Sequence, residues 1–403
     1  MAASGYLERL SEAELSAVDE SKRQAEADRR RRRDPEVRRA EREKIMRRVE
    51  QKMKRETEPG ARRREALKRI QDFDPKQGGV YFTRLCFVNA DRASFDYDEE
   101  SPLGPMRFTD RAYNENDDPA YQLCEAVNIF SMKIASSDVG FPIQVYGTVI
   151  ARDSIDRRCV YLFRRDRDHA QLISSEDESL ILTGPKRGLS LISATYLETD
   201  LKIIIKQQLV EHQAAAAAGR CYINNNPCYK ELSKGVLEIR GMERRPSLSK
   251  CELESCSLDT RLSTVVVTYG VMKGAVEATV SVQVLAGEFH GRITACTSSI
   301  ALNSIVLHDS SSEVDCYGST TTSDDNDDAD GVGVIIHLSR RVVAVSLNTE
   351  MLSLTVVAET GGGVGKCEGT IDFAPRANGG DEAGITVGDV KMLVKITWSI
   401  IDF

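Results

Sequence analysis

The sequence predicts an all-β fold, an antiparallel β-sandwich that follows a charged N-terminal helical arm. Gly140–Asp156 alternates apolar with polar residues, and Val276–Val284 does so most clearly of all. Many more short segments with this period follow one another between turn residues, and no helical pattern separates consecutive strands. Antiparallel sheets packed as a sandwich are therefore expected, rather than the parallel sheet of an α/β protein.

The first part of the chain, residues 1–75, has the composition of a charged helical arm. It is rich in Ala, Glu, Arg and Lys, which are strong helix formers, and opposite charges recur at helical spacing. Its apolar stripe is thin, with Ile45, Val49 and Met53 on one face. Residues 1–70 carry 22 Lys and Arg against 15 Asp and Glu (+7), whereas the other residues carry 32 against 47 (−15). We therefore expect a solvated arm, and only this part could attract polyanions by bulk charge.

A basic patch lies within the arm. Because clustered guanidinium groups neutralise phosphates, the patch predicts either weak nucleic-acid contact through residues 22–69 or a nuclear-import signal. Acidic residues interleave the arginines, and no aromatic residues accompany them for base stacking, which favours a solvated helical face instead. The arginines of the patch are Arg29, Arg30, Arg31, Arg32, Arg33, Arg38, Arg39 and Arg42.

The rest of the chain divides by composition into a loop-rich connecting segment, residues 76–119, and a β domain, residues 120–403. The β domain is expected to be either one sandwich or two lobes, 120–245 and 260–403. Its strands are short runs rich in β-branched and aromatic residues, with Gly, Pro, Asn and Asp making the turns between them. The strands expected, in chain order, are residues 80–89, 127–135, 140–156, 159–163, 189–191, 201–205, 236–240, 262–269, 276–284, 292–300, 305–308, 332–338, 341–347, 352–359 and 391–402.

Two stretches of the β domain resemble each other. GTVIARD, residues 147–153, is followed by LTGPKRGLSLISATYLETDLKI, and GRITACT, residues 291–297, is followed by LSRRVVAVSLNTEMLSLTVV, in the same order and strand rhythm. An internal duplication would produce this pattern, and so would chance similarity between β-strands.

The sequence predicts no membrane segment, no cofactor and no metal site. The start of the chain lacks the apolar run of a secretory signal, and no stretch of about 18 apolar residues follows. We therefore expect a soluble protein of the cytoplasm or nucleus that makes no membrane contact. The cysteines form no CxxC motif and have no nearby histidine pair, so free thiols are expected. They are Cys86, Cys124, Cys159, Cys221, Cys228, Cys251, Cys256, Cys296, Cys316 and Cys367.

Two segments resemble ligand-binding loops and fail in detail. The GGGVGK run, Gly361–Lys366, lacks the first glycine of a phosphate loop, which would be Thr360, and its flanks are strand-like. The DDNDDADG run, Asp324–Gly331, opens like a calcium loop, but His337 stands where a bidentate Glu is needed. We therefore expect a hairpin tip and an acidic low-complexity loop.

Four carboxylates near the central strands are the candidates for catalysis: Asp153, Asp156, Glu198 and Asp200. A pair of them could act as in a glycosidase, but the sequence gives no separation between them. No GxSxG motif is present, and the histidines lie far apart, at positions 169, 212, 290, 308 and 337. A hydrolase of RNA or sugar with a pocket lined by these carboxylates is thus an alternative, and no catalytic residue is assigned.

Several motifs carry a resemblance to a known family: FPIQVYGTVIARDSID, LILTGPKRGLSL, YLETDLKI, LSRRVVAVSL and the closing VKITWSI. Over roughly residues 120–403 the chain resembles a large family of uncharacterised grass proteins built on one domain of unknown function. In some members that domain is fused to a ribosome-inactivating domain of the jasmonate-induced kind. The resemblance transfers no functional residues, because the family has no established activity.

The catalytic motif of a ribosome-inactivating N-glycosidase is not found. Residues 1–119 are too short and too charged for that domain. The nearest strings, beginning at Glu65 and Glu125, lack the arginine of its EAxxR-type helix.

We therefore expect a non-enzymatic interaction or regulatory protein of plants, with a stress or defence role by analogy with the fused relatives and with a protein partner that the sequence does not identify. An RNA- or ribosome-associated protein that uses the basic arm is the second hypothesis, and an enzyme with an unrecognised site is the third.

Overall fold

The structure of the chain is a computed structural model, which describes residues 35–54, 58–86, 96–110, 123–204, 229–241, 251–311, 333–348, 350–359 and 365–401. The chain divides into two compact units, residues 1–95 and 96–403. Every pairing between the described strands is antiparallel. The predicted all-β class and its antiparallel sheets are confirmed.

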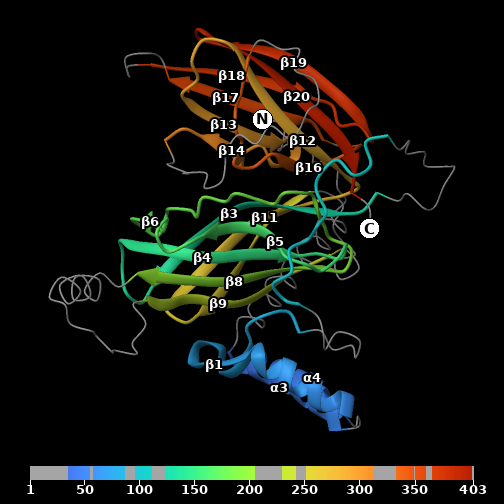
Figure 1. Cartoon of the computed structure of the whole chain (residues 1–403), viewed down its shortest axis with the longest axis vertical. Helices are drawn as coiled ribbons and strands as arrows, with labels where there is room; N and C mark the ends of the chain where they lie inside the picture. Colours follow the sequence, from blue (N-terminus) through green and yellow to red (C-terminus); the bar gives the residue numbers. More distant parts are fainter. Residues whose placement is uncertain are drawn as a thin grey trace, which may run out of the picture. The chain divides into compact units, whose positions relative to one another are not determined.

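The first unit combines two helices with a β-hairpin (Figure 1). Its described elements are α3 (Pro35–Lys54), α4 (Glu58–Arg69), β1 (Gln71–Asp74), the 3-10 turn η1 (Pro75–Gln77) and β2 (Gly79–Phe82). The predicted helical arm is thus present. Both helices and the hairpin bury apolar side chains, namely Val49, Leu67, Ile70 and Tyr81. Arg42 donates to the backbone carbonyl and the side-chain oxygen of Gln77. The arm and the hairpin are therefore one folded unit, and the expected boundary at residue 75 falls inside it.

The second unit contains two β-sandwiches, and the first is built from β3 to β11. One of its sheets has the strand order β10-β11-β3-β7, and the other has the order β5-β4-β8-β9 with β6 beside β4. The strands are β3 (Ala126–Ser137), β4 (Ile143–Arg152), β5 (Val160–Arg165), β6 (Gln171–Ile173), β7 (Leu189–Ser190), β8 (Ala194–Ile204), β9 (Tyr229–Arg240), β10 (Glu252–Thr260) and β11 (Ser263–Met272).

The second sandwich is built from β12 to β20. One sheet has β12 in its interior, with β15 and β16 on one side and β20 then β19 on the other; the second sheet has the order β14-β13-β17-β18. The strands are β12 (Ala275–Ala286), β13 (Gly291–Thr297), β14 (Ile305–Asp309), β15 (Val334–Ile335), β16 (Val342–Ser346), β17 (Leu352–Glu359), β18 (Lys366–Phe373), β19 (Gly379–Val387) and β20 (Val390–Ile400). A second 3-10 turn, η4 (Ser298–Ile300), follows β13.

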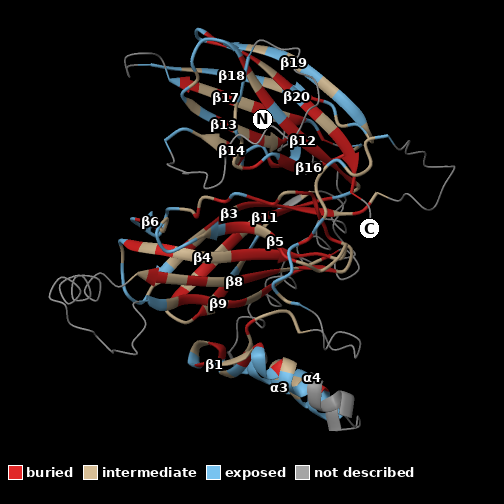
Figure 2. Ribbon diagram, viewed as in Figure 1, coloured by how far each residue is buried: buried red, intermediate tan, exposed pale blue. Residues whose placement is uncertain are grey.

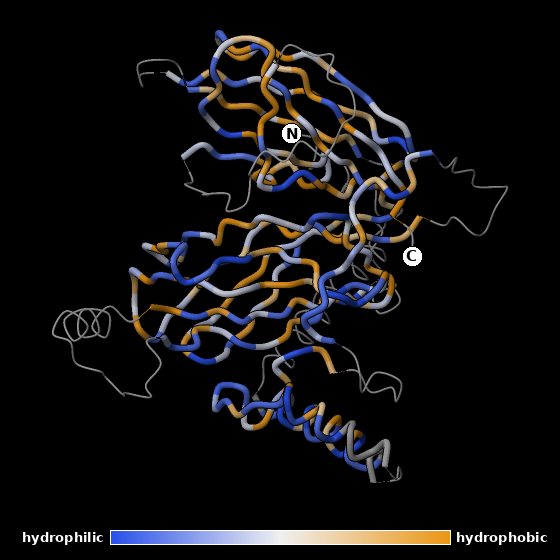
Figure 3. The backbone as a smooth tube through the Cα atoms, viewed as in Figure 1, coloured by the Kyte–Doolittle hydropathy of each residue, from blue (hydrophilic) through white to orange (hydrophobic). Residues whose placement is uncertain are grey.

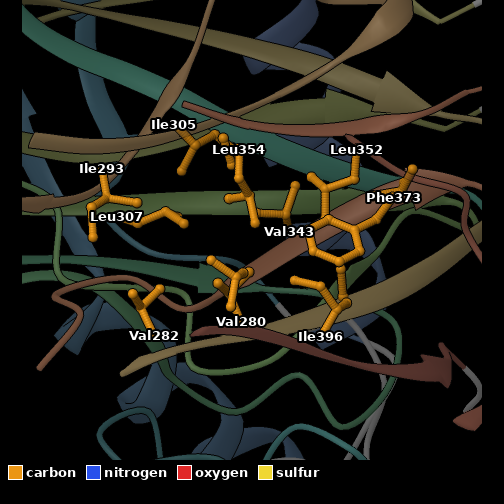
Figure 4. Packing of buried hydrophobic residues seen from close by; sticks show 14 of the residues in the cluster. Val280, Val282, Ile293, Ile305, Leu307, Val343, Leu352, Leu354, Phe373 and Ile396 are labelled. Carbon is orange, nitrogen blue, oxygen red and sulfur yellow. The ribbon is translucent and has the colours of Figure 1, made fainter. Parts of the chain in front are cut away.

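Each sandwich encloses its own apolar core. On β4 the alternate residues Ile143, Val145, Val149 and Ala151 are buried in the first core, as their spacing predicts. Side chains from both sheets of the second sandwich interdigitate, as Figure 4 shows for Val280, Leu354 and Phe373 among others. Figure 2 shows buried residues running along the sandwich strands, whereas α3 and α4 are largely exposed. Figure 3 shows the same contrast in hydropathy.

The two sandwiches share one strand order. The sheets β5-β4-β8-β9 and β14-β13-β17-β18 correspond strand for strand, as do β10-β11-β3-β7 and β19-β20-β12-β16. The resembling stretches GTVIARD and GRITACT lie on the corresponding strands β4 and β13. Gly147 and Gly291, which begin them, have positive φ angles of 115° and 152°. A Cβ at either position would lie 2.1 or 1.9 Å from a carbonyl oxygen of the neighbouring strand.

The chain changes from one sandwich to the other between β11 and β12. Strands β10 and β11 pair with β3, so residues 252–272 belong to the first sandwich. The position expected from sequence, between residues 245 and 260, therefore differs from the observed one, because β11 returns to the interior of the first sheet beside β3.

The sandwiches are joined by polar contacts between β3 and the strand β16. The side chain of Asn128 donates to the carbonyl of Ala344 at 2.7 Å and accepts from its N–H at 2.9 Å. The amide of Asn128 thus satisfies both backbone groups at the β16 edge, as a neighbouring strand would. Arg340 donates to the carbonyl of Ile129 at 2.8 Å, and burial lowers the pKa of Arg340 to about 10.

Candidate functional site

The structure gathers several of the candidate carboxylates with arginines into a buried charged cluster. Its members lie at the C-terminal end of β4 and just after it, on β8 and β12, and in the loop before β7. We name it the charged cluster and define it as Arg152, Asp153, Asp156, Arg187, Glu198 and Glu277.

Arg187 brings Asp153 and Asp156 together. Its Nη1 lies 2.6 Å from Asp153 Oδ2, and its Nη2 lies 3.0 Å from Asp153 Oδ1 and 3.3 Å from Asp156 Oδ1. The side chains of Arg187 and Asp153 are 0% exposed. Asp153 follows the last residue of β4 and also accepts the backbone N–H groups of Ile155 and Ser190 at 3.2 and 3.0 Å. Four donors therefore occupy this one carboxylate.

A second ion pair links the neighbouring strands β4 and β8. Arg152 donates from Nε and Nη2 to the two oxygens of Glu198, at 2.8 and 3.1 Å. Its Nη1 donates to the carbonyl of Arg157 at 3.0 Å. Asp200 lies further along β8, where its side chain is 45% exposed and pairs with Lys202 Nζ at 3.4 Å. The structure thus places Asp153, Asp156 and Glu198 in the cluster, and Asp200 outside these ion pairs.

Glu277 is a member that sequence reasoning missed. The alternation of β12 predicts that it faces water, but it is only 5% exposed. Its Oε1 accepts the N–H of Met106 at 2.7 Å, and its Oε2 accepts the N–H of Gly188. The expectation of a wet face is wrong here, because residues distant in sequence cover this end of β12. Nothing in the local pattern could have revealed that cover.

Burial and charge act in opposite directions within the cluster. Burial lowers the pKa of Arg187, but the hydrogen bonds and charge of Asp153, with help from Asp156, outweigh it and raise the pKa above the ordinary value. Burial raises the pKa of Glu277, and its two backbone N–H donors oppose that rise. The guanidinium of Arg187 is thus held charged, whereas Glu277 ionises at a higher pH than an exposed glutamate does.

A segment made of turns and irregular backbone, residues 96–110, crosses the charged cluster, and we name it the strap. In the first sandwich its backbone pairs with Cys159: the N–H of Ser101 donates to the Cys159 carbonyl at 2.9 Å, and the Cys159 N–H donates to the Glu99 carbonyl at 3.0 Å. In the second sandwich the N–H of Phe108 donates to Ser399 Oγ at 3.0 Å. The strap therefore contacts both sandwiches (Figure 1).

Side chains of the strap add ion pairs and a partly buried hydrogen bond. Glu99 pairs with Arg158 at 3.0 Å, and Glu100 pairs with Lys186 at 2.9 Å. Glu100 also lies 3.7 Å from Arg164. The hydroxyl of Ser101 donates to Asp156 Oδ2 at 2.7 Å. The two glutamates therefore face three cations at the edge of the first sandwich.

The basic patch expected from sequence is described only in part. Arg29–Arg33 lie outside the described residues, and the side chain of Arg38 is not among those described. Arg39 lies on α3, where it is exposed and pairs with Glu43 at 3.4 Å. Arg42 contacts η1 through Gln77. The described arginines of the patch thus take part in contacts within the first unit.

Other candidate sites from sequence receive little from the structure. Residues 324–331 and 361–364 lie outside the described ranges, and Lys366 begins β18 opposite Glu359. Among the described residues, no group of three or more His, Cys, Asp and Glu side chains is placed to hold a metal. The described cysteines are free thiols, and burial raises the pKa of Cys86 and of Cys251 to about 11. No described helix is long and apolar enough to cross a membrane.

The fold and the site define a tandem β-sandwich protein with a buried charged cluster. The chain belongs to the family described as Domain of unknown function (DUF6598), whose model matches residues 126–396. This confirms the expected domain of unknown function; the grass origin and the ribosome-inactivating fusion stay predictions. The strap precedes the matched residues.

No curated protein matches this chain. Among solved structures, it is similar to "Extended-Synaptotagmin 2, SMP - C2A - C2B Domains", with 8% identity over 70% of this chain and 58% of that one and a TM-score of 0.20. It is also similar to "Human GIVD cytosolic phospholipase A2", with 7% identity over 68% of this chain and 30% of that one and a TM-score of 0.20. The chain thus spans less than two thirds of either structure, and TM-scores this low carry no argument about fold or function.

Proposed function

We propose that this chain is a non-enzymatic interaction or regulatory protein whose β-sandwiches recognise a protein partner. The observation that carries the proposal is the state of the carboxylates that the sequence offers for catalysis. Asp153 and Glu198 are buried in two-pronged ion pairs with arginines. A role in plant stress or defence rests on the family resemblance alone and belongs to this proposal.

The ion pairs argue for structure rather than for acid–base chemistry. A general base needs an oxygen within hydrogen-bond reach of the proton it takes. The oxygens of Asp153 already accept from Arg187 and from two backbone N–H groups. Releasing this carboxylate would break a buried pair, which costs about 3–5 kcal/mol. That cost favours a scaffold for recognition over a reaction centre.

Affinity capture with the full chain as bait, followed by binding measurements with the purified partner, tests the proposal. We expect the captured protein to bind with a defined stoichiometry and to have the same mass after it dissociates. If the chain instead converts the captured molecule at a molar ratio far below one, and Glu198→Gln stops the conversion without unfolding the chain, then the chain is an enzyme and the proposal is wrong.

A second candidate function is association with RNA through the basic arm. The observation that favours it is the net charge of +7 in residues 1–70, part of which lies on the exposed helices α3 and α4. RNA binding by the full chain should weaken steeply with salt, and a variant beginning at Asp96 should lose it. The cut at Asp96 removes the first unit as a whole, because that unit ends at residue 95. Equal, weak binding by both chains would remove this candidate.

A further inference from the structure

We propose that the surface beneath the strap is a binding site for an acidic peptide of another protein, and that the strap occupies this site in cis. The inference rests on the proposed function and names the surface and the class of partner. We call this the strap-binding surface. It consists of the backbone of Cys159 and the side chains of Arg152, Asp156, Arg158, Arg164, Lys186, Glu277 and Ser399.

The surface holds the strap mainly through the strap's backbone. Three strap N–H groups, of Ser101, Met106 and Phe108, donate to it. The strap carbonyls of Tyr97, Glu99 and Ser101 accept from it. Around Glu99 and Ser101 these contacts resemble those of a peptide that adds to the edge of a sheet, which fix the backbone without reading most of the sequence. Met106 has a positive φ angle of 58°, so a different peptide has to adopt the same turn there to make the remaining contacts.

Charge supplies the selectivity of the surface. Arg158 precedes β5, Arg164 lies on β5 and Lys186 comes from the loop before β7, yet all three face Glu99 and Glu100 of the strap. Their side chains are 35%, 63% and 38% exposed. Two consecutive carboxylates followed by a hydroxyl group therefore define the preferred peptide.

Three side chains of the surface offer hydrogen bonds to an occupant. Asp156 accepts from the Ser101 hydroxyl, Glu277 accepts from the Met106 N–H, and Arg152 donates to the Tyr97 carbonyl. Each of them also has a partner outside the strap, namely Arg187 for Asp156, the Gly188 N–H for Glu277 and Glu198 for Arg152. The surface therefore stays held in place when the strap leaves, and a second peptide could take up the same hydrogen bonds.

The hold on the acidic part of the strap is weak enough for exchange. Glu99 and Glu100 are 46% and 45% exposed, and ion pairs exposed to this degree contribute little to stability. The strap is favoured chiefly because it is tethered, with an effective concentration on the order of millimolar. A tight acidic ligand, or a local weakening of the strap, shifts the balance.

A charge-swap experiment on the full chain tests the proposal. The probe is a fluorescein-labelled synthetic peptide, DYDEESPLGPMRFTD, corresponding to residues 96–110. The variant Glu99→Lys/Glu100→Lys repels its own strap, so it should bind the probe at least about tenfold more tightly than the wild-type chain in fluorescence anisotropy. The variant Arg158→Glu/Lys186→Glu should reject this probe and bind a peptide in which the same two glutamates are lysines.

Several results would overturn the proposal. They are binding that does not distinguish the probe from a scrambled peptide, charge-swapped pairs that fail to restore binding, or displacement of the probe by an equal concentration of poly-U RNA. The last result would mean that the cations recognise polyanions in general.

Hydrogen exchange on the wild-type chain provides a test that needs no variant. The amides of Ser101, Met106 and Phe108 should exchange much faster than those of β4 and β12, because the strap opens locally. Protection equal to that of the sandwich cores would refute exchange of the strap.

A failure of the charge swap would leave the proposed interaction function standing, with the partner on another face. Conversion of a captured molecule would refute the proposed function without bearing on peptide binding.

Discussion

Removal of Arg187 should destabilise the second unit far more than removal of a surface cation. In Arg187→Met the carboxylate of Asp153, 0% exposed, keeps only its two backbone N–H donors. Breaking a buried ion pair from one side costs about 3–5 kcal/mol. For a unit of this size that corresponds to a fall in Tm of roughly 5–8 °C. The matched control is Lys395→Met, because Lys395 pairs with Glu382 at 3.7 Å and both are more than half exposed. Its expected cost is below about 1 kcal/mol.

The single variants Arg187→Met and Asp153→Leu form a double-mutant cycle with the double variant Arg187→Met/Asp153→Leu. It removes both charges together, so it should be less destabilised than the sum of the single variants by about 2 kcal/mol or more. Urea unfolding followed by far-UV circular dichroism gives the free energy. The fluorescence of Trp398, fully buried in the second sandwich, shows whether that sandwich unfolds in the same transition. A loss in Arg187→Met no greater than in Lys395→Met, or strict additivity in the double variant, would refute the reasoning.

Four further outcomes are expected. Gly147→Ala should lower the free energy of unfolding by about 3 kcal/mol or more, because its Cβ would lie 2.1 Å from a β8 carbonyl oxygen. The control Gly104→Ala places a Cβ with nothing within 4 Å, so its Tm should be unchanged, and equal Tm values for the two variants would contradict the reasoning. Asn128→Asp sets a carboxylate against a β16 carbonyl and should cost about 2 kcal/mol in urea unfolding, so an unchanged midpoint would refute the pairing. Because burial raises the pKa of Glu277 in the folded chain, the wild type should lose stability relative to Glu277→Gln as pH rises from 4.5 through the raised value, and a pH-independent difference would disprove the shift. With a pKa of about 11, Cys251 should react with iodoacetamide at pH 8.5 roughly tenfold more slowly than a thiol with a pKa of 9, because its lower thiolate fraction outweighs the higher nucleophilicity of that thiolate. Mass spectrometry follows the reaction, and labelling as fast as that of the thiol with a pKa of 9 would contradict the shift.

The strands that could be predicted from the sequence are those in which the apolar residues of the alternating pattern are the buried ones. β4, β12 and β20 each bury one complete face in a core, so the apolar period of two is visible in the sequence. β10, β18 and β19 were not expected from the sequence. They are the outermost strands of their sheets in the strand order, and their alternate residues are largely exposed and polar. An edge strand has one neighbour and a wet face, so its pattern is weak.

The candidate site was predictable only in its components. Asp153 and Asp156 attract notice because they follow a strong strand, but their partner Arg187 is more than 30 residues away in sequence, and the family motif around it, LILTGPKRGLSL, assigns it no role. The burial of Glu277 depends on Met106, at a separation of 171 residues. Contacts of this kind are set by the tertiary arrangement, which a single sequence does not reveal.

The shared strand order of the sandwiches bears on the role of the charged cluster. Where the first sandwich has Arg152 and Asp153, the corresponding end of β13 has Cys296 and Thr297, and the same architecture forms without either charge. The charges are therefore dispensable for building such a sandwich. The first sandwich carries them at this position and the second does not, so the two halves are chemically unequal, and substitutions could change these charges without rebuilding either β-sandwich.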